Sequence, residues 1–279
     1  MTNKGNDKQT IAVSYIARGL DVDCFVSFQR FVDSYYRVSA GVEHTLHIIF
    51  KGFSNEADLK KSEAIFNLVD HKSVYLDDDS YDIGAYIEWA KMINDDLICA
   101  LNTSSEIIAS GWLQKLANNL SNPEVGLVGA TASYESLSAI SDEFPWFPNA
   151  HLRSTGFMID RKLFLSTSGE MRILNKMDAY RFESGPESIT QKILARGLDV
   201  LLIGNDGYGY SQEYWPLSNT YRLGKQENLL VSDRLTRDFL EINWYKKKKV
   251  YKKTWGKVRR GKLTELIHRL FSEAFQKIR

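Results

Sequence analysis

The stretch from residue 73 to residue 116 constrains the fold of this chain more than any other part of the sequence. It begins with a short apolar run at 74–76, which leads into three consecutive aspartates. A helix-opening segment that contains Asp82 and Gly84 follows, and then a second apolar run at 97–101 that ends in polar residues. Two strands joined by one helix form a βαβ unit, and polar residues that follow both strands gather at one edge of the sheet. The stretch therefore predicts an α/β sheet with a polar crevice at the carboxyl edge of its strands.

The sequence before this stretch continues the same alternation. Short apolar runs predict strands at 11–17 and 44–50, and apolar residues at helical spacing predict helices at 25–38 and 56–69. Connections between parallel strands are short and right-handed, so these segments predict four parallel strands with helical crossovers.

The sequence after residue 116 extends this pattern with longer irregular segments. We expect further elements in the following order: a helix at 112–120, a strand at 125–130, an aromatic loop at 138–149, a strand at 151–159, a helix within 179–197 and a strand at 200–203. The helix within 179–197 is expected to start around Pro186, with Glu187 in its first turn and Gly197 at its end. Together the segments predict one large α/β domain.

Composition excludes several classes of protein. The 279 residues are 43% hydrophobic and 25% charged, an ordinary globular balance. Cys24 and Cys99 are the two cysteines, so a disulfide framework or a cysteine-based metal site is not expected. Residues 1–9 are polar and expected to be disordered, and no apolar run reaches the ~18 residues of a membrane span. These features favour a cytoplasmic protein.

A basic tail contrasts with the rest of the chain. Residues 245–262 contain ten Lys or Arg and no acidic residue, and 263–278 carry apolar residues along one helical stripe. Residues 241–279 therefore predict a basic amphipathic helical tail that lies on an anionic membrane surface, where each cation contributes ~1 kcal/mol. A helix that docks on a partner, a solvated run of charges and, less favoured, binding to nucleic acid are the alternatives.

Several common catalytic motifs are missing from the sequence. The junction at 17–22 lacks the G-x-G-x-x-G fingerprint, and the chain contains neither a G-x-x-x-x-G-K-[ST] phosphate loop nor a G-x-S-x-G nucleophile. The five histidines show no spacing typical of metal ligands. The carboxylate-rich crevice therefore remains the feature most able to carry chemistry.

A series of motifs in this chain resembles one enzyme family. The motifs, in order, are DIGAY at 82–86, LNTSSEI at 101–107, GWLQKL at 111–116, VGLVGA at 125–130, GFMIDRKLF at 156–164 and FESGPESITQKI at 182–193. Their order and spacing resemble the nucleotide-sugar-dependent glycosyltransferases of the GT-A fold, and within them family 2. The resemblance covers roughly residues 10–240.

The resemblance implies a GT-A, Rossmann-like domain at 10–240, with a mostly parallel sheet flanked by helices. It also implies an inverting transfer of a sugar from a nucleotide diphosphate donor to a glycan or lipid-linked acceptor. The setting that it implies is the synthesis of a surface polysaccharide, such as lipopolysaccharide or capsule, at the inner face of a bacterial membrane.

The resemblance also implies a set of site residues. The donor-binding residues are expected to be Tyr15, Ala17, Arg18, Asp82, Gly84, Asn102, Thr103, Ser104 and Arg153. Arg153 enters this set because a guanidinium pairs bidentately with phosphate oxygens, although an Arg at a strand edge can also pair with a surface acid. Asp82 is also a potential helix N-cap. An inverting transfer needs a carboxylate base, for which Glu183 is preferred over Glu187. Glu187 has an alternative role, because the helix dipole stabilises a carboxylate in the first turn of a helix.

Metal use is left open by a departure from the family pattern. Ser104 stands where the family has the second aspartate of its D-x-D motif, a usual ligand of Mg²⁺ or Mn²⁺. Glu106 lies two residues further on and would project to the same side of an extended segment, so it is the alternative ligand.

Two other functions remain as alternatives. An enzyme that makes sugar nucleotides by nucleotidyl transfer shares a parallel α/β sheet, but it should carry a Gly-rich loop with Arg and Lys after its first strand, which this chain lacks. A non-enzymatic adaptor would act through its basic tail on a membrane or on nucleic acid.

Overall fold

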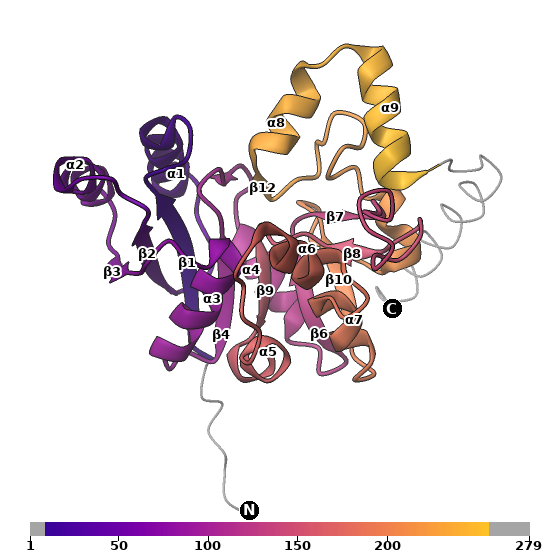
Figure 1. Cartoon of the computed structure of the whole chain (residues 1–279), viewed down its shortest axis with the longest axis horizontal. Coiled ribbons are helices and arrows are strands. Elements are labelled where there is room, and N and C mark those ends of the chain that lie inside the picture. Colours follow the sequence, from indigo (N-terminus) through magenta and orange to yellow (C-terminus); the bar gives the residue numbers. More distant parts are fainter. Residues whose placement is uncertain (1–8, 257–279) are drawn as a thin grey trace, which may run out of the picture.

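A mostly parallel sheet forms the centre of the molecule (Figure 1). The computed structural model describes residues 9–256, and within them the main sheet has eight strands in the order β11-β10-β6-β9-β4-β1-β2-β3. The strands are β1 (Ile11–Arg18), β2 (Thr45–Lys51), β3 (Lys72–Tyr75), β4 (Leu97–Leu101), β6 (Val125–Gly129), β9 (Phe157–Asp160), β10 (Asp199–Ile203) and β11 (Gly209–Tyr210). β9 and β11 run antiparallel to their neighbours, and the other neighbouring pairs are parallel. The predicted fold class, α/β with a mostly parallel sheet flanked by helices, is confirmed.

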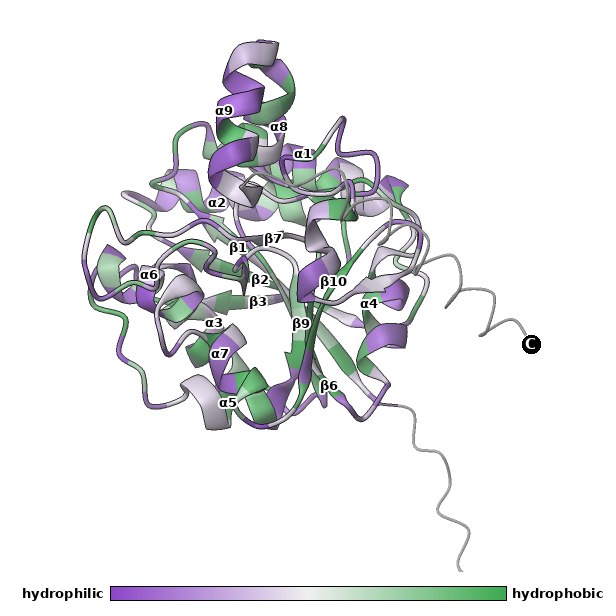
Figure 2. Cartoon of the chain, turned by 90° about the vertical axis from the view of Figure 1, so that its right-hand side faces the viewer, coloured by the Kyte–Doolittle hydropathy of each residue, from purple (hydrophilic) through white to green (hydrophobic). Residues whose placement is uncertain are grey.

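Helices cover both faces of this sheet. One face is covered by α1 (Cys24–Arg37), α2 (Glu56–Phe66) and α4 (Trp112–Leu120). The other is covered by α3 (Tyr81–Met92), α5 (Arg161–Ser168), α6 (Lys176–Ser184) and α7 (Ile189–Leu194). Because both faces are buried, the central strands are apolar along their whole length, as the hydropathy colouring in Figure 2 shows.

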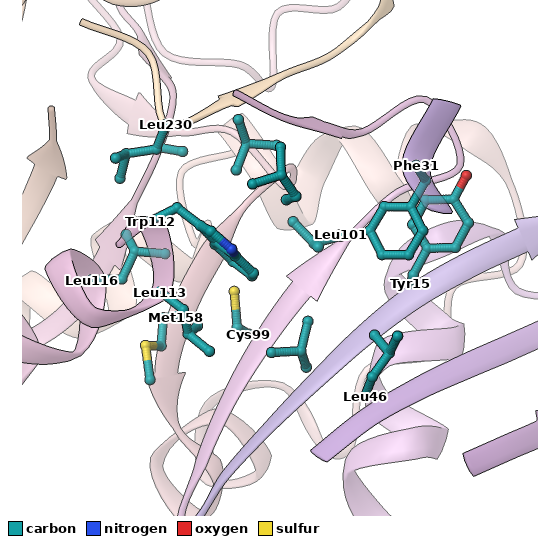
Figure 3. Packing of buried hydrophobic residues seen from close by; sticks show 14 of the residues in the cluster. Tyr15, Phe31, Leu46, Cys99, Leu101, Trp112, Leu113, Leu116, Met158 and Leu230 are labelled. Carbon is teal, nitrogen blue, oxygen red and sulfur yellow. The ribbon is translucent and has the colours of Figure 1, made fainter. Parts of the chain in front are cut away.

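The side chains of β1 show how the two faces are divided. Successive side chains of a strand point to opposite faces. Val13, Tyr15 and Ala17 therefore pack under α1, whereas Ala12 and Ile16 pack under α3. Figure 3 shows Tyr15 stacked on Phe31 of α1, with ring centroids 3.8 Å apart.

The segment 179–197 contains more helix than predicted, because α6 lies before the helix that was expected to start around Pro186. It is divided between α6 and α7, because Gly185 takes an extended conformation (φ −71°, ψ 173°) in front of Pro186. The ring of a proline disfavours the helical conformation of the residue before it, which ends α6 at Ser184. Glu187 consequently lies in the connection before α7 rather than in the first turn of a helix, and Ser188 caps α7.

The segment 151–159 also differs from the single predicted strand. β8 (His151–Leu152) pairs with β7 (Ala132–Ser133) in a separate small sheet, and β9 joins the main sheet. The chain turns between them at Gly156, whose φ of +69° a residue with a side chain rarely adopts. This turn brings residues 153–155 to the carboxyl edge of the main sheet, beside the end of β4.

A third sheet attaches the last helices to this edge. β5 (Glu106–Ile107) pairs with β12 (Val231–Ser232), and α8 (Arg234–Glu241) follows directly. α9 (Trp244–Trp255) then projects away from the sheet beside α8 (Figure 1). The short 3-10 helix η1 (Gln212–Leu217) precedes this region.

Some predictions concern residues outside the described range. Residues 1–8 and 257–279, which include the predicted amphipathic stripe at 263–278, lie outside it. The proposed domain boundaries therefore stay a prediction. Between residues 9 and 256, no helix combines the length and the apolar character needed to cross a membrane.

Candidate functional site

A cavity of about 640 Å³ opens at the carboxyl edge of the main sheet. Its walls come from the loop after β1 with α1, from the end of β4 with the start of α3, and from α8. The lining residues are Asp21, Val22, Asp23, Val26, Ser27, Arg30, Asp82, Asn102, Thr103, Ser104, Arg234, Arg237, Asp238 and Glu241. The predicted polar crevice at this edge is therefore present, and it contains four of the predicted donor-binding residues.

Asn102 organises the wall of the cavity at the end of β4. Its Oδ1 accepts hydrogen bonds from the backbone nitrogen of Ser104 (3.1 Å), the Ser104 hydroxyl (3.1 Å) and the Ser105 hydroxyl (3.0 Å). Its Nδ2 donates to Oγ1 of Thr155 at 2.7 Å. An Asn side chain that binds the backbone two residues on holds a tight turn, so Asn102 sets the shape of the loop that carries Ser104.

Glu183 binds Ser154, the residue before the Thr155 that Asn102 binds. Its Oε2 accepts hydrogen bonds from the backbone nitrogen of Ser154 (2.8 Å) and from the Ser154 hydroxyl (2.5 Å). Within the described residues, its Oε1 has no hydrogen-bond partner. Since Ser154 and Thr155 are consecutive, Glu183 and Asn102 hold adjacent residues, and the preferred base lies next to the cavity wall. Glu183 itself lines a smaller cavity with Arg153, Ser154 and Phe157.

Asp82 contributes a carboxyl group to the main cavity. It is the second residue of α3, and Ser80 occupies the N-cap position, so the N-cap interpretation of Asp82 does not hold. The carboxyl group has no hydrogen-bond partner in residues 9–256. Burial, followed by the charge of Asp21, raises the pKa of Asp82 to about 6. A partly buried acid with a shifted pKa that faces a cavity is typical of a functional site.

Two predicted donor-binding residues lie in the hydrophobic core instead. The side chains of Tyr15 and Ala17 are fully buried under α1, because strand alternation turns them away from the cavity. The Tyr15 hydroxyl donates to the carbonyl oxygen of Thr103 at 2.5 Å, so Tyr15 supports the cavity wall from behind. Thr103 is also buried, and its Oγ1 has no partner among the described residues.

The two predicted cationic residues are already paired. Arg18 binds Asp78 through Nε (2.9 Å) and Nη2 (2.7 Å) and binds Asp21 through Nη1 (2.7 Å). The Arg153 guanidinium lies 2.7 Å from Asp233 and 4.3 Å from the ring centroid of Tyr221. Arg153 thus forms a buried ion pair with Asp233, the pairing with an acid that was its alternative role, and its contact with a phosphate stays a prediction.

Gly84 and Glu187 do not line the main cavity. A side chain at Gly84 would overlap the side chain of Ser80, so this glycine is required by the packing of α3 against the preceding loop. Glu187 is exposed and lines neither cavity.

Glu106, the alternative metal ligand, contacts two arginines. Its Oε2 lies 3.4 Å from Nη1 of Arg237 and 3.9 Å from Nε of Arg30. Nη2 of Arg237 also donates to the carbonyl oxygen of Ser104 at 3.1 Å. Two guanidinium groups beside the only carboxylate of this loop repel a divalent cation, and no cluster of three metal-ligating side chains exists between residues 9 and 256. The residues at Ser104 and Glu106 therefore do not fit a metal site.

The sequence interpretation missed Arg30, Arg234 and Arg237, three arginines that line this cavity. Arg30 follows Val26 by four residues on α1, a helical spacing that could have placed both on one face. The position of Arg237 had no such signal, because the pairing of β5 with β12 brings α8 to the cavity.

Comparison with known proteins places this chain near several solved structures. No protein-family model matches it, and no curated protein matches it. Three similar structures are a mannosyltransferase from Pyrobaculum calidifontis in complex with GDP-Man and Mn²⁺, a glucosyl-3-phosphoglycerate synthase from Mycobacterium tuberculosis with Mn²⁺ and UDP, and 4-diphosphocytidyl-2C-methyl-D-erythritol synthase from Anaerococcus prevotii.

The similarity to these three structures is low. The mannosyltransferase is 10% identical, with 70% of this chain and 54% of that chain covered and a TM-score of 0.46. The glucosyl-3-phosphoglycerate synthase is 13% identical, with 56% of this chain and 58% of that chain covered and a TM-score of 0.37. The 4-diphosphocytidyl-2C-methyl-D-erythritol synthase is 16% identical, with 72% of this chain and 88% of that chain covered and a TM-score of 0.46. At these identities and TM-scores the three proteins assign neither a family, an activity nor a ligand to this chain.

Proposed function

We propose that this chain is a glycosyltransferase that moves a sugar from a nucleoside diphosphate donor to a hydroxyl group of an acceptor with inversion. The observation that carries the proposal is the arrangement at Ser154 and Thr155. These consecutive residues hold the carboxylate of Glu183 on one side and Asn102, in the wall of the large polar cavity, on the other. The proposed base and the wall of the proposed donor cavity are thus hydrogen-bonded to consecutive residues.

The proposed reaction uses Glu183 as the general base. The acceptor oxygen attacks the anomeric carbon of the sugar and loses its proton to Oε1 of Glu183. The bond between the anomeric carbon and the phosphate oxygen breaks, and its electron pair leaves with the nucleoside diphosphate. Ser154 orients the carboxylate by holding Oε2 through its backbone nitrogen and hydroxyl.

Three other residues are assigned to the donor. Asp82 faces the cavity with an unpaired carboxyl group, which can accept hydrogen bonds from hydroxyl groups of a ribose or a sugar. Ser104 and Asn102 form the wall beside it, where Asn102 holds the loop in shape. The cavity is therefore lined both by groups that accept hydrogen bonds and by arginines.

We also propose that the enzyme works at an anionic membrane surface, which suits a lipid-linked acceptor in surface polysaccharide synthesis. α9 begins with Trp244 and Tyr245, whose side chains are 74% and 68% exposed, and six lysines follow between 246 and 253. Exposed aromatic rings beside lysines are typical of a segment that lies on an anionic bilayer. Figure 1 shows α9 projecting from the body, where it is free to touch such a surface.

The experiment that tests the enzymatic proposal measures turnover of a panel of nucleotide sugars. The full chain is incubated with uridine, guanosine and thymidine diphosphate sugars and simple glycan acceptors, and release of nucleoside diphosphate and thermal stabilisation are measured. We expect one donor to stabilise the protein and to be consumed. Glu183→Gln should lower turnover by about 10²–10⁴-fold and leave donor stabilisation unchanged, because it removes the base alone.

The matched control is Glu187→Gln, which should keep full turnover because Glu187 is exposed and lines neither cavity. Retained turnover in Glu183→Gln would move the base elsewhere. Release of pyrophosphate from a nucleoside triphosphate and a sugar phosphate would instead identify a nucleotidyltransferase. Salt-sensitive binding to DNA without stabilisation by any sugar nucleotide would identify a non-enzymatic adaptor.

A further inference from the structure

Two arginines from distant parts of the chain lie beside the same carboxylate in the wall of the cavity. Arg30 lies on α1 and Arg237 on α8, and both line the cavity together with Ser104. Their guanidinium groups approach the same oxygen, Oε2 of Glu106, at 3.9 Å and 3.4 Å. The pairing of β5 with β12 brings α8 to this position, so the arrangement is a product of the tertiary fold.

The charges in this arrangement are unbalanced. Two guanidinium groups share one carboxylate, and both distances exceed the ~2.7–2.9 Å of a tight charge-assisted hydrogen bond. Burial, followed by the charge of Arg30, lowers the pKa of Arg237. The side chains of Arg30 and Arg237 are 34% and 24% exposed, so both are open to a ligand.

A diphosphate is the group that fits beside these two arginines. The planar fork of a guanidinium matches two phosphate oxygens, and Arg stays charged when partly buried. The cavity is also lined by the acids Asp21, Asp23, Asp82, Asp238 and Glu241, which disfavour an anion beside them. The phosphates are therefore placed beside Arg30, Arg237 and Ser104.

We propose that Arg30 and Arg237 bind the diphosphate of the donor directly, in place of a divalent cation, and that Glu106 positions their guanidinium groups. This inference rests on the proposed function and adds how the leaving group is stabilised. When the bond to the sugar breaks, its electron pair remains on the phosphate oxygen, and two fixed guanidinium groups neutralise the charge that develops there.

Binding of nucleoside diphosphates with and without metal tests the inference. Calorimetry on the full chain with UDP, GDP, ADP and CDP, and with inorganic pyrophosphate, is carried out in EDTA and in Mn²⁺. We expect one nucleoside diphosphate to bind in EDTA with an affinity within about threefold of that in Mn²⁺ (less than ~1 kcal/mol).

Substitution of the arginines gives the second measurement. Arg30→Ala and Arg237→Ala should each lower the affinity for that nucleoside diphosphate in EDTA by about tenfold or more, since each removes charge-assisted hydrogen bonds. Arg37→Ala is the matched control: Arg37 is exposed at the end of α1, outside the cavity, and its loss should leave the affinity unchanged. Arg30→Lys and Arg237→Lys keep the charge and the packing, and should show a smaller loss in the same direction.

Glu106→Gln separates the two roles of Glu106. If Glu106 positions the arginines, the variant should lower the affinity in EDTA, because the guanidinium groups lose the carboxylate that orients them. If Glu106 binds a metal, the variant loses an Mn²⁺-dependent gain in affinity instead.

The outcomes distinguish this inference from the proposed function. Binding that requires Mn²⁺ and is unaffected by Arg30→Ala and Arg237→Ala would overturn the inference and leave a metal-dependent glycosyltransferase. Failure of every nucleoside diphosphate to bind in either condition would overturn the proposed function itself.

Discussion

Asp82 combines an unpaired carboxyl group with a position in the cavity wall, and burial raises its pKa to about 6. In the unfolded chain the pKa of an aspartate is about 3.9. The folded state therefore holds the proton more tightly than the unfolded state. The contribution of Asp82 to stability is fully present below about pH 4 and is lost as the pH rises to about 6. Above that pH the ionised carboxylate destabilises the fold unless a ligand satisfies it.

Asp82→Asn should raise the free energy of unfolding at pH 8 by on the order of 1–2 kcal/mol, a figure reduced because the group is partly exposed. The gain should shrink at pH 4.5, where Asp82 is largely protonated in the folded protein. Urea unfolding at the two pH values measures the difference. The same variant should weaken donor binding, since an amide accepts fewer hydrogen bonds than a carboxylate.

Asp79→Asn serves as the control for this measurement. Asp79 is exposed in the loop before α3, and its substitution should change the free energy of unfolding by less than about 0.5 kcal/mol at both pH values. An equal gain for Asp82→Asn at pH 4.5 and pH 8 would show that titration of Asp82 is not the cause.

α8 is the element that completes the cavity, and Asp233 holds it in place. The Asp233 carboxylate accepts a hydrogen bond from the backbone nitrogen of Thr236 at 2.8 Å, as the N-cap of α8. Its second oxygen pairs with Arg153 at 2.7 Å, and the side chain is only 3% exposed. Burial alone would raise the pKa of Asp233, but the charge of Arg153 and these hydrogen bonds hold it below the usual value.

Asp233→Ala should lower the free energy of unfolding by about 3–5 kcal/mol, because it leaves Arg153 buried without a partner and also removes a helix cap. Donor affinity should fall with it, since α8 carries Arg237. Urea unfolding and calorimetry measure the two effects.

Asn175→Ala is the matched control at the element scale. Asn175 caps α6 through Asp178 with no buried ion pair, so its loss should cost only about 1 kcal/mol. Asp233→Asn keeps the capping oxygen and loses the charge. Its loss in free energy of unfolding should lie between those of Asp233→Ala and Asn175→Ala. A cost for Asp233→Ala no larger than that of Asn175→Ala would show that the Arg153 pair contributes little.

The charges of the whole molecule are segregated. The chain has 36 basic and 35 acidic residues, but α9 alone contributes six lysines and no acid. The hydropathy colouring in Figure 2 shows the polar character of α9 where it projects from the body. Because α9 is positively charged and carries exposed aromatic rings on a nearly neutral molecule, we expect an anionic surface to attract the molecule with α9 facing it.

The double substitution Trp244→Ala and Tyr245→Ala should lower binding to vesicles that contain about 30% anionic lipid by roughly tenfold, because two exposed rings no longer enter the interface. Flotation of the full chain measures the binding, and added salt should weaken it further. Tyr36→Ala removes an equally exposed ring from α1 and should leave binding unchanged. Unchanged flotation of the double variant would exclude α9 as the contact.

The outcome for individual residues shows which inferences the sequence supports. Asp82, Asn102, Thr103 and Ser104 were predicted at the site and do line the cavity, because they follow strands whose carboxyl ends share one edge. The side chain of Tyr15 lies in the core and not in the cavity, since a strand buried on both faces shows no alternation that tells which side its residues face.

The sequence by itself determined most strands of the main sheet, most helices that cover it and the edge at which the cavity forms, because apolar periodicity and polar strand ends are local features of the chain. The tertiary structure alone decided which cations remain available to a ligand. Arg18 and Arg153 are neutralised by Asp78 and Asp233, which lie far away in the sequence. Arg30 and Arg237 meet at the cavity only because two short strands pair. Ion pairing depends on distances in space, and the sequence does not contain those distances.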